Sequence, residues 1–380
     1  MSRAQEMHAG GELAVDATRA VIGLARDVHL TIARDVERFL PPPIRQVATC
    51  HIRVVGFTYD LVESLNVIGL RAGALVLGAL PGPAPTRTRV GRAVQPVVNG
   101  IWGDAVLAKA SELAVLMALR VDHDDVTPDA EGLADAFPKA TGHLVLFVHG
   151  LVESDESWFT RVGTPEGRTS FGERLEADLG ATALYLRYNS GLVIADNGAL
   201  LDTLLDAVRA AWPVPVERID LVGHSMGGLV AREAVLAGAD RGAAWVDDVG
   251  SVTTLGTPHQ GAPLAGMAPV GEWLLTTTAR SAPFARLLSG RSAGIRDLTR
   301  GSGGRRPHTM PGHVAQHSMA GTLTRSALVG WALGDGMVRA ASALLPVPDG
   351  AGNLDRLPGV GHQALLRHES VYERLRRWLG

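Results

Sequence analysis

Cysteine is nearly absent from this chain of 380 residues, in which Cys50 is the only one. No disulfide can form within the chain, so a small secreted fold held by disulfides is excluded and a reducing compartment is favoured. A lone cysteine becomes a catalytic nucleophile only beside an activating base. We expect Cys50 to be a small, buried, apolar residue without a catalytic role.

A targeting signal and a long apolar run are also missing. Residues 1–12 are polar and contain glycine, whereas a signal peptide carries a compact apolar stretch behind a basic leader. The most apolar run, residues 65–80, contains Asn66 and Arg71 and is shorter than the roughly 20 apolar residues that span a bilayer. We expect a soluble, cytoplasmic protein, and association with a membrane surface stays open.

Charge of one sign is not in excess either. The 36 Lys and Arg residues nearly balance the 39 Asp and Glu residues, which gives a formal net charge of −3. A protein that attracts nucleic acid through its overall field needs a marked positive excess. We therefore expect no nucleic-acid partner.

Apolar residues recur at helical spacing in the first 120 residues. They return every three or four positions over 13–39, 54–75 and 98–117, and prolines at 41–43 and 81–85 follow the first two stretches. These patterns predict about three helices, which pack on one another or on the domain that follows. Whether their apolar faces dock on lipid, on a partner protein or on a second copy in a homo-oligomer stays open. The acidic, turn-rich segment 121–141 is predicted to be a linker.

After residue 141 the pattern changes to short β-rich runs that alternate with helices. Strands are predicted over 144–148, 183–188, 218–222, 252–255 and 318–323, and helices over 198–211, 228–237 and 371–379. Such alternation is typical of an α/β domain whose mainly parallel sheet is covered by helices on both faces. We therefore divide the chain into an N-terminal helical region with its linker, 1–140, and an α/β domain, 141–380. Residues 262–306 are inserted between two strands and either cover the site as a cap or lid or simply cover the sheet.

The functional prediction depends first on the motif Gly223-His224-Ser225-Met226-Gly227. A G-x-S-x-G sequence forms a sharp turn between a strand and a helix, and this copy stands between a predicted strand and a predicted helix. Its glycines leave room for a strained turn, and the helix N-terminus favours negative charge nearby. The competing interpretation is a glycine-rich turn whose serine only caps the helix. We predict that Ser225 is a nucleophile.

A nucleophilic serine needs an acid and a histidine, which follow it in that chain order in this kind of domain. The predicted base is His362, between a turn and the last helix, and the predicted acid is Asp335, on a loop between two glycines. An aspartate in that role fixes the histidine tautomer and stabilises the imidazolium. The alternatives for the two roles are His308, His313, His317 and His368 for the base, and Asp349 and Asp355 for the acid.

The oxyanion that forms during acyl transfer needs backbone N–H donors rather than a particular side chain. One donor is the residue after the nucleophile, Met226. The second is predicted at Leu151, because Gly150 permits close approach of the loop that follows the first strand of the domain. His149 and His224 are expected to be structural residues.

Several short motifs follow one another in a fixed order over residues 141–380. They are Val148-His149-Gly150-Leu151, Arg187-Tyr188-Asn189-Ser190-Gly191, Asn197-Gly198, residues 223–228, Leu255-Gly256-Thr257-Pro258-His259-Gln260-Gly261, Gly334-Asp335-Gly336 and Gly361-His362. In this order they resemble bacterial α/β-hydrolases related to triacylglycerol lipases and GPI inositol-deacylases. The resemblance implies an α/β-hydrolase fold with a triad of Ser225, Asp335 and His362. It does not reach the N-terminal third, and it implies no particular substrate.

The predicted reaction is cleavage of a carboxylic ester. His362 takes the proton of Ser225, which forms an acyl-enzyme that water then hydrolyses. We expect a small hydrophobic, lipid-like ester as substrate and neither a cofactor nor a metal, since the cluster of histidines at 308, 313 and 317 lacks the spacing of a metal-binding helix. Two alternatives stay open: an acyltransferase with the same triad, and a lipid- or partner-binding protein in which the helical region is the functional part.

Overall fold

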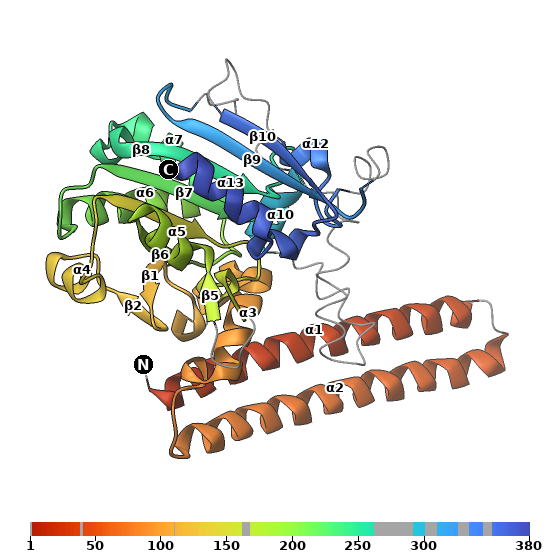
Figure 1. The fold of residues 1–380 in the computed structure, drawn as a ribbon. Helices are drawn as coiled ribbons and strands as arrows, with labels where there is room; N and C mark the ends of the chain where they lie inside the picture. Colours follow the sequence, from red (N-terminus) through yellow and green to blue (C-terminus); the bar gives the residue numbers. More distant parts are fainter. Residues whose placement is uncertain are drawn as a thin grey trace. The chain divides into compact units, whose positions relative to one another are not determined.

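A computed structural model shows the fold (Figure 1) and describes residues 2–38, 41–109, 111–161, 168–261, 292–300, 310–325, 334–344 and 352–380. The chain forms two compact units. The first unit contains the described residues with numbers up to 95 and from 105 to 114. The second unit holds the described residues of 96–104, 115–261 and 292–380.

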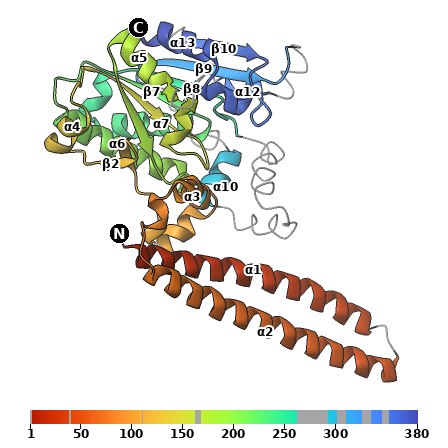
Figure 2. The same ribbon diagram turned by 60° about the horizontal axis from the view of Figure 1, so that its bottom comes forward.

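The N-terminal region contains the three expected helices. Helices α1 (Arg3–Arg38) and α2 (Pro42–Ala79) run antiparallel as a long hairpin and lie side by side in both views (Figures 1 and 2). Helix α3 (Arg89–Lys109) contains Pro96 and bends at Trp102, where φ is −128° and ψ is 26°. The 3-10 turns η1 (Pro85–Arg87) and η2 (Ser111–Leu113) stand on either side of α3 in the chain.

The first proline cluster begins a helix as well as ending one. Proline lacks an N–H and has a fixed φ, which suits the first turn of a helix. Pro41 is the N-cap residue of α2, and Pro42 is its first residue. For this reason α2 starts well before residue 54, where the apolar stripe predicted it.

The apolar stripe of α2 is exposed. Val54, Phe57, Leu61, Leu65 and Ile68 are each between 46% and 69% exposed. Cys50 on the same helix is also exposed, so the expectation of a buried cysteine was wrong. By length and composition alone, the stretch Ile44–Ala79 is long and apolar enough to cross a membrane, and an 18-residue window within it has a mean hydropathy of 1.5. The run 65–80 is shorter than the length needed to span a bilayer, but it is only the C-terminal part of this longer apolar helix.

An eight-stranded sheet forms the centre of the second unit, in the order β10-β9-β8-β7-β3-β6-β1-β2. The strands from β10 to β6 are parallel to their neighbours, and β1 and β2 add an antiparallel edge. The strands of this sheet are β1 (Ala118–Val121), β2 (Asp124–Val126), β3 (His143–Val148), β6 (Thr182–Arg187), β7 (Arg218–His224), β8 (Val249–Leu255), β9 (Ala315–Thr322) and β10 (Gly352–Pro358). Strands β4 (Phe159–Arg161) and β5 (Arg168–Ser170) form a separate small hairpin.

Helices cover both faces of the sheet, as expected. Successive side chains of a strand point to opposite faces. Leu144 and Leu146 of β3 belong to the core under α6 and α7, whereas Val145 and Phe147 belong to the core under α5 and α13. In the described part of this unit, the helices after α3 are α4 (Ala130–Ala136), α5 (Phe171–Leu179), α6 (Ile194–Ala211), α7 (Met226–Arg241), α10 (Ala293–Arg300), α12 (Ala340–Ala343) and α13 (Glu369–Leu379). Its 3-10 turns are η3 (Asp155–Trp158), η4 (Ala244–Asp248) and η8 (His362–Leu366).

The chain order creates a switch point between β3 and β7. After β3 the chain adds β6 on one side, and it then crosses back to place β7 on the other side. In open α/β sheets, ligands bind outside the carboxyl ends of the strands at such a point. Ser225 follows the carboxyl end of β7 and therefore lies at this position.

The segment 121–141 was wrongly predicted to be a linker. It contains β2 and α4, and together with β1 it forms the antiparallel edge of the sheet. Asp122 and His123, with φ values of 49° and 73°, form the two-residue turn between β1 and β2. Turns with positive φ at both positions favour short polar residues. Charged side chains are also typical of an edge strand, so this composition fits a hairpin as well as a linker.

Strand β10 was missed, and with it the surroundings of Asp355. This residue, an alternative for the acid, lies on the strand and pairs with Arg374 of α13. Half-exposed side chains at the edge of the sheet hid the apolar pattern of the strand. Of the insertion 262–306, residues 292–300 are described and contain α10, and the remainder lies outside the described residues, as do His308 and Asp349.

Candidate active site

Ser225 stands in the turn between β7 and α7 with a backbone conformation that few side chains tolerate. Its φ is 51° and its ψ is −123°. A Cβ on Gly223 would lie 2.4 Å from the backbone nitrogen of Gly228, and one on Gly227 would lie 2.2 Å from the carbonyl oxygen of Val148. Only glycine fits at these two positions, so the strand–turn–helix context predicted from the motif is confirmed. The Ser225 amide donates to the carbonyl of Leu255 at 2.8 Å and fastens the turn to β8.

We expect Ser225→Gly to fold more stably than Ser225→Ala. Glycine adopts the φ of 51° without strain, whereas alanine keeps the Cβ that makes it unfavourable. Strain of this kind amounts to about 1–3 kcal/mol, and glycine's freedom in the unfolded chain offsets part of it. The free energy of unfolding, measured in urea, should be about 1 kcal/mol higher for the glycine variant. A less stable glycine variant would mean that the turn is not strained.

His362 and Asp335 form a buried hydrogen-bonded pair. The Nδ1 atom of His362 lies 2.7 Å from Oδ2 of Asp335, and both side chains are nearly inaccessible. The other carboxylate oxygen accepts the backbone N–H groups of Met337 at 3.0 Å and Val338 at 2.8 Å. Burial opposes ionisation of Asp335, but His362 and these hydrogen bonds hold its pKa below the usual value. The carboxylate is therefore fixed, charged and directed at one nitrogen of the imidazole.

Ser225 and this pair lie at the same edge of the sheet, where the parallel strands have their carboxyl ends. Ser225 follows β7, Asp335 comes after β9, and His362 comes after β10. Gly256, at the end of β8, stands against the pair: a Cβ there would lie 3.0 Å from Oδ2 of Asp335 and 3.1 Å from Nδ1 of His362. The ring of His224, the residue before Ser225, lies 4.7 Å from the ring of His362.

The rival residues occupy other surroundings. His368 is the N-cap residue of α13, and its side chain accepts the amide of Ser370. His313 donates to the carbonyl of Val246, while His317 stacks on Trp378. Within the described residues, no three His, Cys, Asp or Glu side chains form a group that could hold a metal ion.

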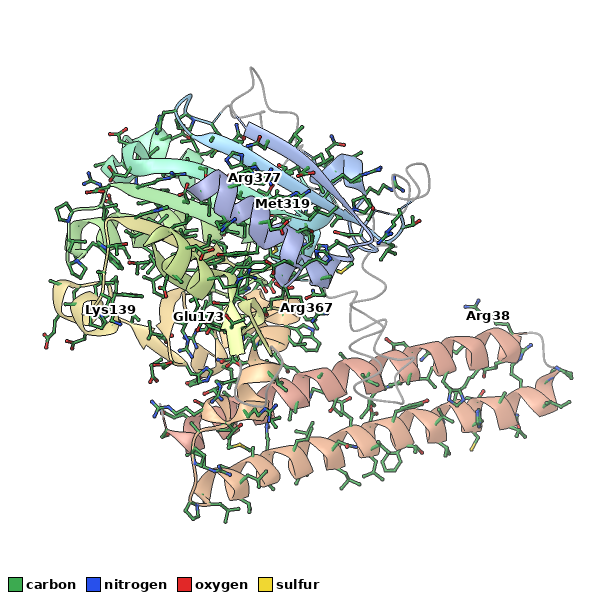
Figure 3. The ribbon with its side chains drawn as sticks, viewed as in Figure 1. Arg38, Lys139, Glu173, Met319, Arg367 and Arg377 are labelled. Atoms are coloured by element: carbon green, nitrogen blue, oxygen red, sulfur yellow. The ribbon has the colours of Figure 1, made fainter. Side chains whose placement is uncertain are left out.

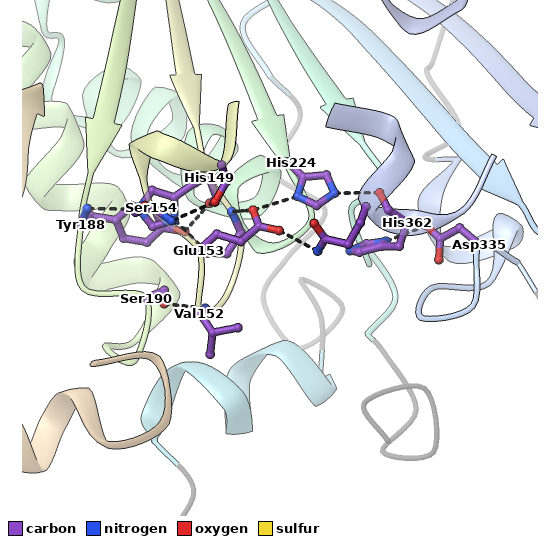
Figure 4. A network of polar contacts seen from close by, with 12 residues as sticks. His149, Val152, Glu153, Ser154, Tyr188, Ser190, His224, Asp335 and His362 are labelled. Atoms are coloured by element: carbon purple, nitrogen blue, oxygen red, sulfur yellow. Dashed lines mark hydrogen bonds and ion pairs between the residues drawn. The ribbon is translucent and has the colours of Figure 1, made fainter. Parts of the chain in front are cut away.

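The loop after β3 lies against Ser225. A Cβ on Gly150 would be 3.1 Å from Cβ of Ser225. The Gly150 amide donates to Glu153 at 2.7 Å, and the Val152 amide donates to Ser190 Oγ at 3.1 Å (Figure 4). Between them, the Leu151 amide has no acceptor among the described residues. It is the amide that this loop leaves available as a donor.

His149 is held as a structural residue of the same loop. Its ring stacks on Tyr188 at 4.3 Å, its Nδ1 bonds the carbonyl of Gly150, and its Nε2 accepts the amide of Tyr188. Burial lowers its pKa to about 4, so it is neutral at physiological pH. The side chain thus stiffens the loop as a fixed, uncharged tautomer.

Glu153 is the residue of this region that sequence reasoning missed. Its carboxylate contacts the Gly150 amide, His224 and Gln363, which come from three separate segments of the chain (Figure 4). A spacing signal did exist: a Glu three residues after Gly150 can reach back to that amide, as a Glu does in a helix capping box. Its other contacts join positions far apart in the sequence and have no local signal.

Three features of this chain are those of the α/β-hydrolase fold: the strand order, the strained serine turn after β7, and the Asp–His pair after later strands. A family described as a domain of unknown function (DUF7379) matches residues 113–299, just under half of the chain. The likeness to GPI inositol-deacylases stays a prediction.

Three solved structures illustrate what the chain is similar to. A lipase of Bacillus licheniformis in its propeptide form is 21% identical, with a TM-score of 0.46 over 70% of this chain and 53% of the lipase chain. A metagenomic carboxyl esterase is 18% identical, with a TM-score of 0.39 over 63% of this chain and 75% of that one. The RedJ thioesterase of prodiginine biosynthesis in Streptomyces coelicolor is 17% identical, with a TM-score of 0.40 over 64% and 91%. This chain therefore spans about half of the lipase chain. Because these TM-scores lie below 0.5, the fold assignment rests on the strand order and on the turn at Ser225.

Proposed function

We propose that the protein is a serine carboxylic-ester hydrolase that acts through an acyl-enzyme on Ser225. The observation that carries this proposal is the buried Asp335–His362 pair beside the strained serine turn. A carboxylate bonded to Nδ1 holds the proton there and leaves Nε2 free to accept one. A serine hydroxyl needs such a base to become nucleophilic.

The reaction then proceeds in two acyl-transfer steps. Nε2 of His362 takes the hydroxyl proton as Ser225 Oγ attacks the ester carbonyl, and Asp335 stabilises the imidazolium. The amides of Leu151 and Met226 donate to the oxyanion. The alcohol leaves with the proton from His362, and a water molecule attacks the acyl-enzyme by the same route, which releases the acid and regenerates Ser225.

The substrate class that we propose is a hydrophobic, lipid-like ester. The test is hydrolysis of p-nitrophenyl esters by the purified protein, from acetate to long acyl chains. We expect kcat/KM to rise from acetate to medium chains, since each buried methylene favours binding in an apolar pocket. Folded protein that hydrolyses none of these esters would contradict the function. Ester formation that exceeds hydrolysis when an alcohol is added would replace it with acyl transfer.

We also propose that α2 associates with a lipid surface. Over residues 54–79, all of which the structure describes, the charged residues of α2 are paired with α1. The three ion pairs are Asp60 with Arg26, Glu63 with Arg19, and Arg71 with Glu12. Because of this pairing, the charges of the segment lie where α2 contacts α1. The exposed Phe57, Leu61 and Ile68 form an apolar stripe. Such a stripe fits the boundary between lipid headgroups and acyl chains.

Arginines near the tip of the hairpin fit the same partner. Arg38 ends α1 at this tip (Figure 3), and Arg45 and Arg53 lie on the first turns of α2. A basic side chain near an anionic lipid surface contributes about 1 kcal/mol to binding. Apolar and basic residues on one helix therefore favour an anionic membrane over a neutral one.

Co-sedimentation with anionic liposomes tests the role of α2. We expect Phe57→Ser/Ile68→Ser to reduce the bound fraction by about 10-fold or more, because each exposed side chain contributes roughly 1.5–3 kcal/mol when buried. The control is Thr58→Ala/Asn66→Ala, which changes two exposed polar residues of the same helix. Equal binding by wild type and the serine variant would overturn the proposal. So would a wild-type dimer in solution that the serine variant lacks and that does not bind liposomes.

A further inference from the structure

One carboxylate, that of Glu153, lies between the loop after β3 and the loop that carries His362, and its side chain is only 10% exposed. Oε2 of Glu153 accepts the Gly150 amide at 2.7 Å and faces Nδ1 of His224 at 3.0 Å. Oε1 accepts Nε2 of Gln363 at 2.9 Å. The two oxygens thus contact three segments that are far apart in the sequence (Figure 4).

His224 extends this connection to the carbonyl of His362. Its Nε2 donates to that oxygen at 3.2 Å, and its side chain is fully buried. With Nδ1 on a carboxylate and Nε2 on a carbonyl, both nitrogens face acceptors. An imidazole that donates from both nitrogens is the protonated, charged form.

The pairing keeps both partners charged despite their burial. For each group burial opposes the charged form, but the facing partner outweighs it: the pKa of Glu153 is lowered to about 2, and that of His224 is raised. An ion pair in such a place adds little net stability over an apolar filling, so stability alone does not account for it. Removing one partner leaves the other charge buried and unpaired.

We infer that Glu153 and His224 form a positioning pair that sets the distance between the oxyanion loop and the catalytic histidine. The inference rests on the proposed ester-hydrolase function and adds two residues to its site, neither of which touches the reacting atoms. Glu153 holds the Gly150 amide, and therefore the direction of the neighbouring Leu151 amide. His224 holds the carbonyl of His362 and directly precedes Ser225.

This geometry affects the transition state more than the bound substrate. Oxyanion donors act when they lie about 2.7–3.1 Å from the developing charge, and displacement by about 1 Å costs roughly 100-fold in rate. The ester substrate carries little charge on its carbonyl oxygen before attack. Loss of the positioning pair should therefore lower kcat and leave KM nearly unchanged.

Glu153→Gln is the variant that tests the pair, because glutamine has nearly the same shape but no charge. We expect kcat for p-nitrophenyl butyrate to fall about 10- to 100-fold, with KM within about threefold of wild type. Fluorophosphonate labelling of Ser225 should slow by a similar factor. Glu153→Ala removes all three contacts and should lose more, but Glu153→Gln decides the outcome if the alanine variant does not fold.

The matched control is Asp202→Asn on α6. Asp202 is also a buried carboxylate, and it binds Arg241 and Trp245. Its neutralisation should lower the free energy of unfolding while kcat stays within about twofold of wild type. A folded Glu153→Gln enzyme with wild-type kcat would overturn the inference, as would an equal loss of kcat in Asp202→Asn. Inactivity of wild type itself would instead count against the ester-hydrolase function.

A double-mutant cycle asks whether the two residues act together. If they form one unit, Glu153→Gln/His224→Gln should lose no more activity than the worse single variant. Losses that multiply would show that the two residues act separately and would contradict the pair. The cycle is read on kcat in folded variants, so a shared loss of stability does not imitate the result.

Discussion

Ser225→Ala should lose ester hydrolysis by about 10⁴-fold or more in kcat, because no other group can form the acyl-enzyme. Cβ of Ser225 lies against the loop at Gly150, and Asp335 is bonded to Nδ1 of His362, which in the proposed reaction leaves Nε2 to take the serine proton. Removal of the nucleophile leaves these groups without a reaction to assist. Initial rates with p-nitrophenyl butyrate at saturating substrate measure the change.

The control for this variant is Ser64→Ala. Ser64 lies on α2, and its hydroxyl donates to a carbonyl of its own helix. Its replacement should leave kcat unchanged, and both variants should show the circular dichroism of wild type. Substantial hydrolysis by folded Ser225→Ala would mean that the protein cleaves esters at another place.

Asp335→Asn should lower kcat by about 10³- to 10⁴-fold with little change in fold. The carboxylate oxygen that faces His362 at 2.7 Å would be replaced, in part of the population, by an NH₂ group that cannot accept the Nδ1 proton. The imidazole then favours the other tautomer, in which Nε2 already carries a proton and cannot act as the base. Because the Oδ1 contacts with Met337 and Val338 can persist, the loop should keep its conformation.

Asp355→Asn is the matched control because sequence left Asp355 as an alternative acid. The residue pairs with Arg374 of α13, whereas the ion pair of His362 in the described part of the chain is with Asp335. Its substitution should leave kcat within about twofold of wild type. A larger loss for Asp355→Asn than for Asp335→Asn would reverse the assignment of the acid.

The serine turn was predictable because five consecutive residues form it. Its candidate partners were predictable because the acid and the histidine follow the serine in a fixed chain order. The two glycines of the motif already indicated a close approach, which the contacts of Gly223 and Gly227 confirm. The order of acid and histidine then left few candidates. Whether Ser225, Asp335 and His362 carry the reaction stays a prediction that the variants test.

What the sequence could not reveal depends on contacts across the chain. Glu153 gains its importance from His224 and Gln363, which are 71 and 210 residues away. The edge strand β2 was mistaken for part of a linker because a solvent-facing strand lacks the apolar run of a buried one. Cys50 was expected inside because cysteine usually is, but α2 turns that side outward.

Mapping of a fluorophosphonate adduct tests the central claim most directly. The wild-type protein is treated with the probe and digested, and mass spectrometry locates the modified residue. A single adduct per chain on Ser225, absent from Ser225→Ala and formed much more slowly in Asp335→Asn, is the predicted result. Folded wild-type protein that takes up no label, or takes it up on a residue other than Ser225, would contradict the assignment of Ser225 as the nucleophile.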